Sequence, residues 1–416
     1  MPGFTLKKNR WFVEGVPLSA VAEKVGTPSY VYSHSAFERR FREIDRAYAA
    51  RPHLVAYSLK ANANLALVRS LGQQGAGADV VSGGELYKAR QAGIPADRII
   101  YAGVGKTNEE IRYALQEGIR YFNVESLPEM QAIDEVAASL DQTASVAVRF
   151  NPDVDAMTHH YITTGKKESK FGISIADVDD VIETTRKCRH VRFTGVHAHI
   201  GSQITSTAPL KTAVAVLEHL VQYLRQEGVA ITTLNLGGGY GIPYNGEKVP
   251  KASDWARQVL PAVKRLNVFL IVEPGRYISG NSGVLLTRVL YVKKSHAKTF
   301  VIVDAGMNDL LRPALYGAHH EIAPVEIRGK ARVKVDVVGP ICESSDFLAK
   351  DRLLPVVSRG DVLAVFSAGA YGSTMASQYN GRPLVPEVVV RGSRVVVARR
   401  RQRREELLTL ESAEKL

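Results

Sequence analysis

The feature that most restricts the fold of this chain is a regular alternation of short apolar runs with amphipathic segments, from about residue 55 to residue 276. The runs have the length and composition of buried strands, and the segments between them carry apolar residues at helical spacing. Eight strands separated by helices predict an α/β fold, a (β/α)8 TIM barrel. A doubly wound sheet is the alternative, but it usually has fewer strands and a glycine-rich first turn. The runs are 54–59, 78–81, 98–102, 120–124, 145–150, 193–199, 233–236 and 269–272.

The pattern changes after Arg276, where strand-like runs follow one another without long helices between them. Residues 1–30 also have the character of strand and turn. We therefore predict a TIM barrel over residues 31–278 and a second, all-β, sandwich-like domain from residues 1–30 and 279–416. The end of this second domain, residues 391–416, is a basic tail. The later runs are 284–293, 299–305, 331–338, 361–366, 387–390 and 394–399.

The charge and hydropathy of the chain exclude two classes of partner. The formal net charge is +12, but seven arginines lie within the last 26 residues. A basic run at a chain end is more often solvated than bound to nucleic acid, and no aromatic residues are interleaved there for stacking on bases. The longest apolar runs have only strand length, which is too short to span a membrane. We expect no nucleic-acid and no membrane partner, whereas anionic small molecules remain compatible with the charge.

The cysteine content indicates a reducing compartment. Cys188 and Cys342 are too few for a disulfide framework. The first ten residues include basic side chains, but no apolar stretch of a secretory signal follows them. We therefore expect a cytoplasmic protein.

Lys60 lies where the first barrel strand ends, and catalytic groups of TIM barrels gather at such ends. It could be an ordinary surface lysine, since most lysines are exposed. It could also be a desolvated amine of lowered pKa that holds a carbonyl cofactor as a Schiff base. The other strand ends favour the second interpretation, because they are polar and include glycines that let backbone N–H groups approach a phosphate. They carry Asp79, Ser82, Glu125, Arg149, Asn151, His197, His199, Ser202, Gly237, Gly238, Gly239, Glu273, Gly275 and Arg276.

Two stretches of the chain resemble nucleotide-binding motifs, but neither motif is complete. Residues 105–107, Gly-Lys-Thr, match the end of a P-loop, but the first glycine of that motif would fall at position 100, which is isoleucine. The run 237–239 lacks the third glycine of a dinucleotide fingerprint, because position 242 is also isoleucine. Neither motif therefore predicts a nucleotide site.

A metal site is the other alternative. His197 and His199 are two residues apart on a strand and so share one face, as metal ligands could. Two imidazoles do not complete a coordination shell, and the other strand ends carry mainly Lys, Gly and Glu. We expect no metal.

Five stretches resemble the fold type III pyridoxal-phosphate decarboxylases, which share the barrel of alanine racemase. Two further stretches are similar to the substrate motifs of one branch, the diaminopimelate decarboxylases. The resemblance runs in order from about residue 26 to about residue 388, and the arginine-rich tail lies outside it. The first five are YSLKAN at 57–62, HAHIGSQ at 197–203, LGGGYG at 236–241, EPGR at 273–276 and GAY at 369–371, and the other two are MNDLLRPALYG at 307–317 and CESSD at 342–346.

The resemblance implies a role for each group around a pyridoxal 5'-phosphate cofactor. Lys60 would hold the cofactor covalently, and Glu273 would keep its pyridine nitrogen protonated, so that the ring accepts the electrons left when CO2 departs. Racemases of this fold are expected to have arginine instead, so Glu273 favours decarboxylation. His199 would lie against the ring, with Asp79 orienting the histidine. Around the phosphate we expect Ser202, Gly237, Gly238, Gly239, Gly275, Arg276 and Tyr371.

The resemblance also implies the substrate groups. The end of diaminopimelate that does not react presents a carboxylate and an ammonium. Arg276 and Arg312 suit the carboxylate, and Glu343 suits the ammonium. Cys342 is similar to the family's donor of a proton to the carbanion and would reach over from a second subunit, which implies a homodimer. Two tyrosines would orient the substrate, Tyr316 and Tyr371.

The predicted function is thus decarboxylation of meso-2,6-diaminopimelate to L-lysine and CO2, the last step of lysine biosynthesis. Two alternatives remain: a decarboxylase of another basic amino acid such as ornithine, lysine or arginine, and a non-catalytic protein that binds pyridoxal phosphate. The stretches 160–165 and 170–172 also resemble the family, with a departure at His160, where a small residue or proline is expected.

Overall fold

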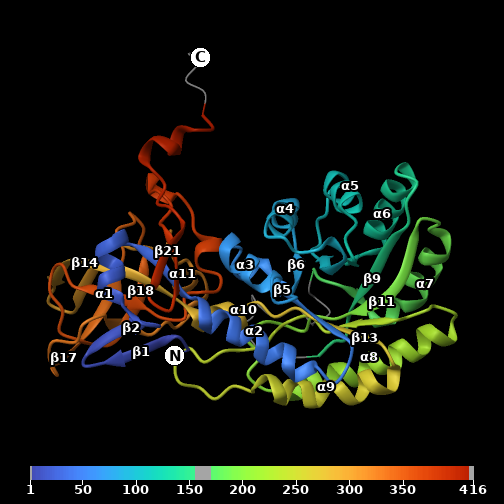
Figure 1. Ribbon diagram of the computed structural model, residues 1–416, viewed down its shortest axis with the longest axis horizontal. Helices are drawn as coiled ribbons and strands as arrows, with labels where there is room; N and C mark the ends of the chain where they lie inside the picture. Colours follow the sequence, from blue (N-terminus) through green and yellow to red (C-terminus); the bar gives the residue numbers. More distant parts are fainter. Residues whose placement is uncertain (1, 155–169, 412–416) are drawn as a thin grey trace. The chain divides into compact units, whose positions relative to one another are not determined.

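The computed structural model describes residues 2–154 and 170–411, which form two compact units (Figure 1). The barrel unit comprises Arg40–Ile242 and Lys248–Tyr277. The β unit comprises Met1–Arg39, Pro243–Glu247 and Ile278–Leu416. The stretch 160–165 lies outside the described residues.

Eight parallel strands form a closed barrel, which confirms the predicted fold class. Their order around the barrel follows the chain, because each strand pairs with the next and β13 pairs with β5. All the pairings are parallel, so the carboxyl ends of the strands meet at one end of the barrel. The short β10 (Ile173–Ser174) pairs with β9 beside them. The eight strands are β5 (His53–Ser58), β6 (Gly77–Val80), β7 (Ile99–Tyr101), β8 (Tyr121–Val124), β9 (Ala144–Asn151), β11 (Val191–His197), β12 (Thr233–Asn235) and β13 (Phe269–Val272).

Helices surround these strands, and Figure 1 shows α4, α5, α6 and α7 outside them. Local sequence sets several of the starts: Ser82, Thr107 and Ser126 each accept a hydrogen bond from the backbone N–H three residues further on. The residue at that position is a glutamate in every case, which is the arrangement of a helix N-terminus. The helices are α2 (His34–Tyr48), α3 (Leu65–Gly72), α4 (Gly83–Gln91), α5 (Asn108–Glu117), α6 (Leu127–Ser139), α7 (Val178–Lys187), α8 (Ala208–Gln226) and α9 (Ala252–Leu266).

The β unit contains one large and one small sheet. The small sheet has the order β1-β2-β3, and the large one β18-β17-β15-β14-β4-β20-β21, with β19 paired to β14 and β16 paired to β19. The strand before the barrel, β4, therefore lies in the same sheet as strands that follow it. The strands are β1 (Phe4–Lys7), β2 (Arg10–Val13), β3 (Val16–Pro17), β4 (Ser29–Ser33), β14 (Gly283–Lys294), β15 (Thr299–Val303), β16 (Ile322–Pro324), β17 (Arg332–Val338), β18 (Phe347–Pro355), β19 (Val362–Val365), β20 (Glu387–Arg391) and β21 (Arg394–Arg399).

Two expectations for this unit are wrong in part. Residues 1–30 are not only strand and turn, because α1 (Leu18–Val25) is a helix. Leu18, Val21 and Ala22 have the spacing of one helix face and pack into the core of the β unit. The unit is therefore mostly, rather than wholly, β.

The basic tail begins as folded structure and not as a solvated end. Alternating valines and arginines form β21, which pairs with β20 as an antiparallel hairpin. Arg399 lies 3.2 Å from Glu387 as an ion pair, and Arg401 donates to the backbone oxygen of Pro28 at 2.8 Å. β21 confirms the strand-like run predicted at 394–399, and its backbone hydrogen bonds are satisfied by the neighbouring strand. Nowhere in residues 2–154 or 170–411 is a helix both long and apolar enough to cross a membrane.

Candidate active site

The carboxyl end of β5 places Lys60 beside a buried carboxylate. Lys60 lies in a single 3-10 turn, η1 (Leu59–Ala61), directly after the strand. Its Nζ is 2.7 Å from Asp79 Oδ2, and Ser58 Oγ donates to the same oxygen at 2.6 Å. The Asp79 side chain is fully buried, whereas the Lys60 side chain is 37% exposed. The amine is thus fixed by an ion pair and can still be reached by a ligand.

Asp79 contacts Lys60 in this structure, whereas the resemblance implied that it orients His199. Its second oxygen, Oδ1, accepts no hydrogen bond from any described residue. Burial raises the pKa of Asp79, the Lys60 ammonium opposes that rise, and the negative charge of Glu273 adds to it. Lys60 is therefore the positive charge that balances a buried carboxylate.

Glu273 follows β13 and carries a second buried carboxylate. Its Oε1 accepts hydrogen bonds from Asn123 Nδ2 at 3.1 Å and from Asn235 Nδ2 at 2.6 Å. Its Oε2 is 3.4 Å from His197 Nε2. Burial by itself would raise the pKa of Glu273, but His197, Lys60 and Asn235 outweigh it and lower the pKa. This carboxylate is therefore ionised at neutral pH.

His199 is oriented by the backbone of the glycine run. The N–H of Gly238 donates to His199 Nδ1 at 3.0 Å, so the neutral ring carries its hydrogen on Nε2. Burial lowers the pKa of His199 well below its usual value, and the positive charges of Arg149 and Lys60 lower it further. Arg149 itself donates to Glu125 at 2.8 Å and to the backbone oxygen of His199 at 3.3 Å. The imidazole is thus a neutral ring oriented by the Gly238 N–H, while Arg149 binds the backbone oxygen of His199.

The run Gly237–Gly239 is needed for close packing around these groups. A Cβ on Gly237 would lie 2.6 Å from His199 Nδ1, and a Cβ on Gly238 would lie 2.3 Å from the backbone oxygen of Glu273. The N–H groups of Gly237 and Gly238 both donate to side chains of the barrel. The role of the run around a phosphate therefore stays a prediction, and in this structure two of its N–H groups are bonded within the barrel.

Arg276 and Ser202 form a polar pair at the same end of the barrel. Arg276 donates from its guanidinium to Ser202 Oγ at 3.1 Å. A Cβ on Gly275 would lie 2.8 Å from Ala61 Cβ, so the loop after β13 packs against the turn that carries Lys60. The barrel unit thus brings together Lys60, Asp79, His199, Ser202, Gly237, Gly238, Gly239, Glu273, Gly275 and Arg276.

Sequence reasoning missed two amides that act on this site. Asn123 in β8 and Asn235 in β12 both donate to Glu273, and Asn235 also donates to Tyr121 at 3.0 Å. Each is a fully buried polar side chain inside a barrel strand. Buried polar groups are normally hydrogen-bonded, so an amide at such a position is the signal that could have found them.

Lys106, in the incomplete P-loop motif, has a structural role. Its side chain is buried, and Nζ lies 2.5 Å from Glu129 Oε1. It also donates to the backbone oxygens of Gly103 at 2.7 Å and Asn123 at 2.8 Å. Lys106 therefore ties the end of β8 to α6.

The β unit carries the remaining predicted residues. Arg312 begins the short helix α11 (Arg312–Tyr316) and is buried. Cys342 is exposed between β17 and β18, so it is not a buried apolar cysteine, and its N–H donates to Asn380 Oδ1 at 2.8 Å. Asp346 holds this loop by accepting from the N–H of Ile341 at 2.6 Å. Glu343 is also exposed, whereas Tyr316 and Tyr371 are partly buried.

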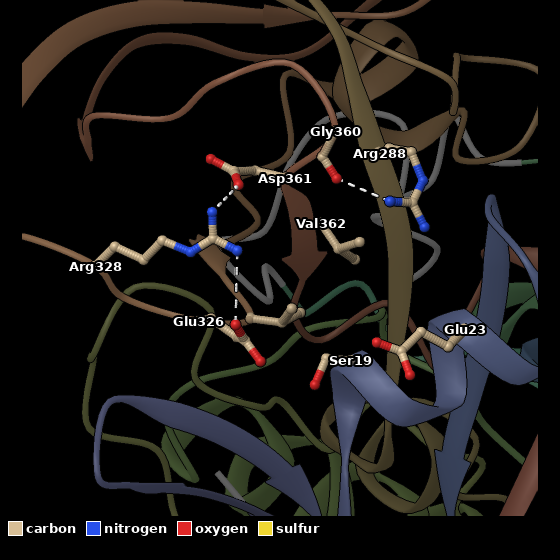
Figure 2. Close-up of a pocket in the computed structure, with 9 residues that line it drawn as sticks. Ser19, Glu23, Arg288, Glu326, Arg328, Gly360, Asp361 and Val362 are labelled. Atoms are coloured by element: carbon tan, nitrogen blue, oxygen red, sulfur yellow. Dashed lines mark hydrogen bonds and ion pairs between the residues drawn. The ribbon is translucent and has the colours of Figure 1, made fainter.

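A separate cavity of about 130 Å³ lies in the β unit (Figure 2). Arg328 lies between Glu326, at 3.7 Å, and Asp361, at 3.2 Å. Arg288 donates to the backbone oxygen of Gly360 at 2.8 Å. None of the predicted site residues lines this cavity, so it is distinct from the groups described above.

Comparison with known proteins identifies the family. A family model described as the pyridoxal binding domain of pyridoxal-dependent decarboxylases matches residues 34–280. The diaminopimelate decarboxylase of Aquifex aeolicus is 46% identical over 402 residues, which cover 96% of this chain and 95% of that protein. The chain belongs to the diaminopimelate decarboxylase family.

Two further relatives support this family assignment. The diaminopimelate decarboxylase of Pseudomonas aeruginosa is 46% identical over 99% of both chains. The crystal structure of diaminopimelate decarboxylase from Helicobacter pylori, complexed with L-lysine, has a TM-score of 0.91 at 41% identity and covers 95% of this chain and 99% of that one. Similarity over 99% of the chain takes in the arginine-rich tail, which corrects the expectation that the tail lies outside it.

The donors at the barrel end fit the pyridoxal phosphate of this family. An accessible amine, Lys60, lies at the same end of the barrel as Glu273, an ionised carboxylate that can pair with a protonated pyridine nitrogen. The neutral ring of His199 can lie against an aromatic ring. Ser202 and Arg276 supply a hydroxyl and a guanidinium, the donors that suit a phosphate.

Replacing Gly238 with alanine is expected to weaken cofactor binding by about tenfold or more. The added Cβ would lie 2.3 Å from the backbone oxygen of Glu273, and relieving such overpacking typically costs about 1–3 kcal/mol. The dissociation constant would be measured by titrating pyridoxal phosphate and following its absorbance. Gly105→Ala is the matched control, because a Cβ there meets nothing within 4 Å. Equal affinities of the two variants would contradict the expected crowding.

Proposed function

We propose that this chain decarboxylates meso-2,6-diaminopimelate to L-lysine and CO2 with pyridoxal phosphate as its cofactor. The observation that carries the proposal is the presence of Lys60 and ionised Glu273 at one end of the barrel. The substrate is taken from the similarity to diaminopimelate decarboxylases, 46% identical over nearly the whole chain.

The barrel unit would hold the cofactor. Lys60 would bind it covalently, Glu273 would keep a proton on its pyridine nitrogen, and His199 would lie against its ring. When bound, pyridoxal phosphate accepts the electron pair that remains after CO2 departs. Asp79 accepts a hydrogen bond from the Lys60 ammonium at 2.7 Å and so fixes the position of the amine. The phosphate is proposed to be held by Ser202, Gly237, Gly238, Gly239, Gly275, Arg276 and Tyr371.

The β unit would supply most of the groups that recognise the substrate. The unreacted end of diaminopimelate has a carboxylate and an ammonium, so it needs one cationic and one anionic partner. Arg312, with Arg276, is proposed to bind the carboxylate, and Glu343 the ammonium. Tyr316 and Tyr371 would orient this end. A substrate without the second carboxylate would leave Arg312 without its ligand, which disfavours ornithine, lysine and other basic amino acids that have a single carboxylate.

Purified protein mixed with pyridoxal phosphate and meso-diaminopimelate should therefore release L-lysine and CO2 in equal amounts. Ornithine, lysine and arginine tested in the same assay should be poor substrates. No turnover of diaminopimelate with the cofactor bound would reject the proposal. Faster turnover of ornithine, lysine or arginine would favour the related decarboxylase instead.

Cys342 is proposed to protonate the carbanion, acting at the site of a second copy in a homodimer. Its thiol is exposed, as a group that serves another subunit must be. Size measurement in solution, with and without cofactor, tests the dimer.

We further propose a cytoplasmic location, since neither Cys188 nor Cys342 forms a disulfide.

Replacing Cys342 with serine should lower kcat by about a hundredfold or more with little change in KM. A hydroxyl is a far weaker acid than a thiol, and positioned proton transfer typically contributes about 10²–10⁴ in rate. Folding should be preserved because Cys342 is exposed. Cys188→Ser removes the chain's other thiol and should behave as wild type. An unchanged kcat in the Cys342 variant would assign the proton transfer to another group.

A further inference from the structure

Arg312 contacts an imidazole and a tyrosine ring in the β unit. Its Nη1 lies 2.8 Å from His320 Nε2, and its guanidinium carbon lies 4.7 Å from the centre of the Tyr244 ring. Both Arg312 and His320 are buried, and Tyr244 also meets the His320 ring edge-on at 5.5 Å. The three side chains therefore form one packed cluster.

The contacts of His320 determine its protonation. A guanidinium has donors only, so His320 Nε2 must accept the hydrogen bond from Arg312. His320 Nδ1 lies 2.8 Å from the backbone oxygen of Phe366, which can only accept, so Nδ1 carries the hydrogen. Phe366 in turn donates its N–H to the backbone oxygen of Glu321 at 2.8 Å. The imidazole is thus neutral, with Nδ1 anchored to the backbone and Nε2 facing Arg312.

These two contacts restrain the direction of the Arg312 guanidinium, and neither of them brings a negative charge to it. A carboxylate in the place of His320 would also hold the arginine, but it would neutralise the charge that a substrate carboxylate needs. We propose that His320 is a positioning residue that aims Arg312 at the carboxylate of the unreacted substrate end and so sets the preference for a substrate with two carboxylates. This inference rests on the proposed function, and it concerns only the specificity of the site.

Two ligands that differ by one carboxylate test the inference. L-Lysine keeps the carboxylate of the unreacted end, whereas 1,5-diaminopentane has the same chain and amines without it. Their dissociation constants would be measured on the holoenzyme from the change in cofactor absorbance, with the KM for meso-diaminopimelate measured in parallel. In His320→Asn, whose shorter amide can still bond Phe366 but does not reach Arg312, lysine binding and KM should weaken about tenfold or more. The affinity for 1,5-diaminopentane should stay within about twofold of the wild-type value, because Arg312 has no group to bind on that ligand.

Two variants serve as controls. The side chain of His320→Gln is longer than that of His320→Asn, so its amide oxygen can accept a hydrogen bond from Arg312. This variant should recover part of the lysine affinity. His319→Phe breaks the neighbouring pair of the same kind, in which His319 Nε2 lies 2.8 Å from Arg352, and should bind both ligands as wild type does. If His320→Asn does not fold, Tyr244→Leu removes the aromatic contact to Arg312 and should show the same selective loss.

The outcomes separate the possible roles. Equal weakening of both ligands would show a packing defect, and no weakening of lysine would show that Arg312 does not depend on His320; either result overturns the inference. Failure of the proposed function would show differently, as wild-type protein that does not turn over diaminopimelate. The comparison of the two ligands requires no turnover and so remains decisive in that case.

Discussion

Replacing Lys60 with alanine is expected to abolish decarboxylation, lowering kcat by about a thousandfold or more. The amine is the proposed point of covalent attachment, and a group that also moves protons at the reacting centre typically contributes about 10²–10⁴ by itself. The visible absorbance of the bound cofactor should be lost or shifted together with the activity. Steady-state rates and one absorbance spectrum of the purified variant measure both effects.

Lys60→Arg separates the covalent role of this lysine from its ion pair. Arginine keeps a positive charge near Asp79, whose carboxylate lies 2.7 Å from the native amine, but it does not form the covalent bond. We therefore expect it to be as inactive as the alanine variant while unfolding at a temperature closer to that of the wild type. Alanine leaves Asp79 buried without its counter-charge, which destabilises the fold. Appreciable activity in either variant would show that Lys60 does not attach the cofactor.

The barrel could be predicted because its strands carry a local signal. Each strand is a short apolar run, and the helices between them repeat apolar residues at their own period, so the order of elements follows from the chain alone. The position of Lys60 follows from the same signal, since it is the first charged residue after β5. α1 was missed because it is short and lies among strands. Its only sign is the spacing of Leu18, Val21 and Ala22.

The hydrogen bonds inside the site could not be predicted, because they depend on which strands become neighbours. Asp79 reaches Ser58 and Lys60 only once β6 pairs with β5 in the observed register. Glu273 is reached by amides from β8 and β12, which lie far apart in the chain and meet only when the barrel closes. Sequence reasoning therefore found the charged groups at the strand ends but not the neutral side chains that fix them.

Replacing Glu273 with glutamine is expected to lower kcat by about a hundredfold to a thousandfold while the cofactor stays bound through Lys60. A neutral amide does not keep the proton on the pyridine nitrogen, and loss of one preorganised electrostatic group typically costs about 10²–10³ in rate. The fold should survive, because the amide oxygen of glutamine can still accept from Asn123 and Asn235. Melting temperature, cofactor content and kcat, each measured for the same preparation, distinguish a lost charge from a lost fold.

The pH dependence of this variant provides a second test of the charge. His197, Lys60 and Asn235 outweigh burial and lower the pKa of Glu273, so the carboxylate stays ionised as the pH falls, down to that lowered pKa. The ratio of wild-type to Glu273→Gln activity should therefore be constant between about pH 6 and 9, since the wild-type charge does not titrate there. Glu273→Asp keeps the charge on a shorter side chain and should recover part of the rate. If the glutamine variant kept its rate, or if the ratio collapsed as the pH approached 6, then Glu273 would not be the permanent anion opposite the cofactor.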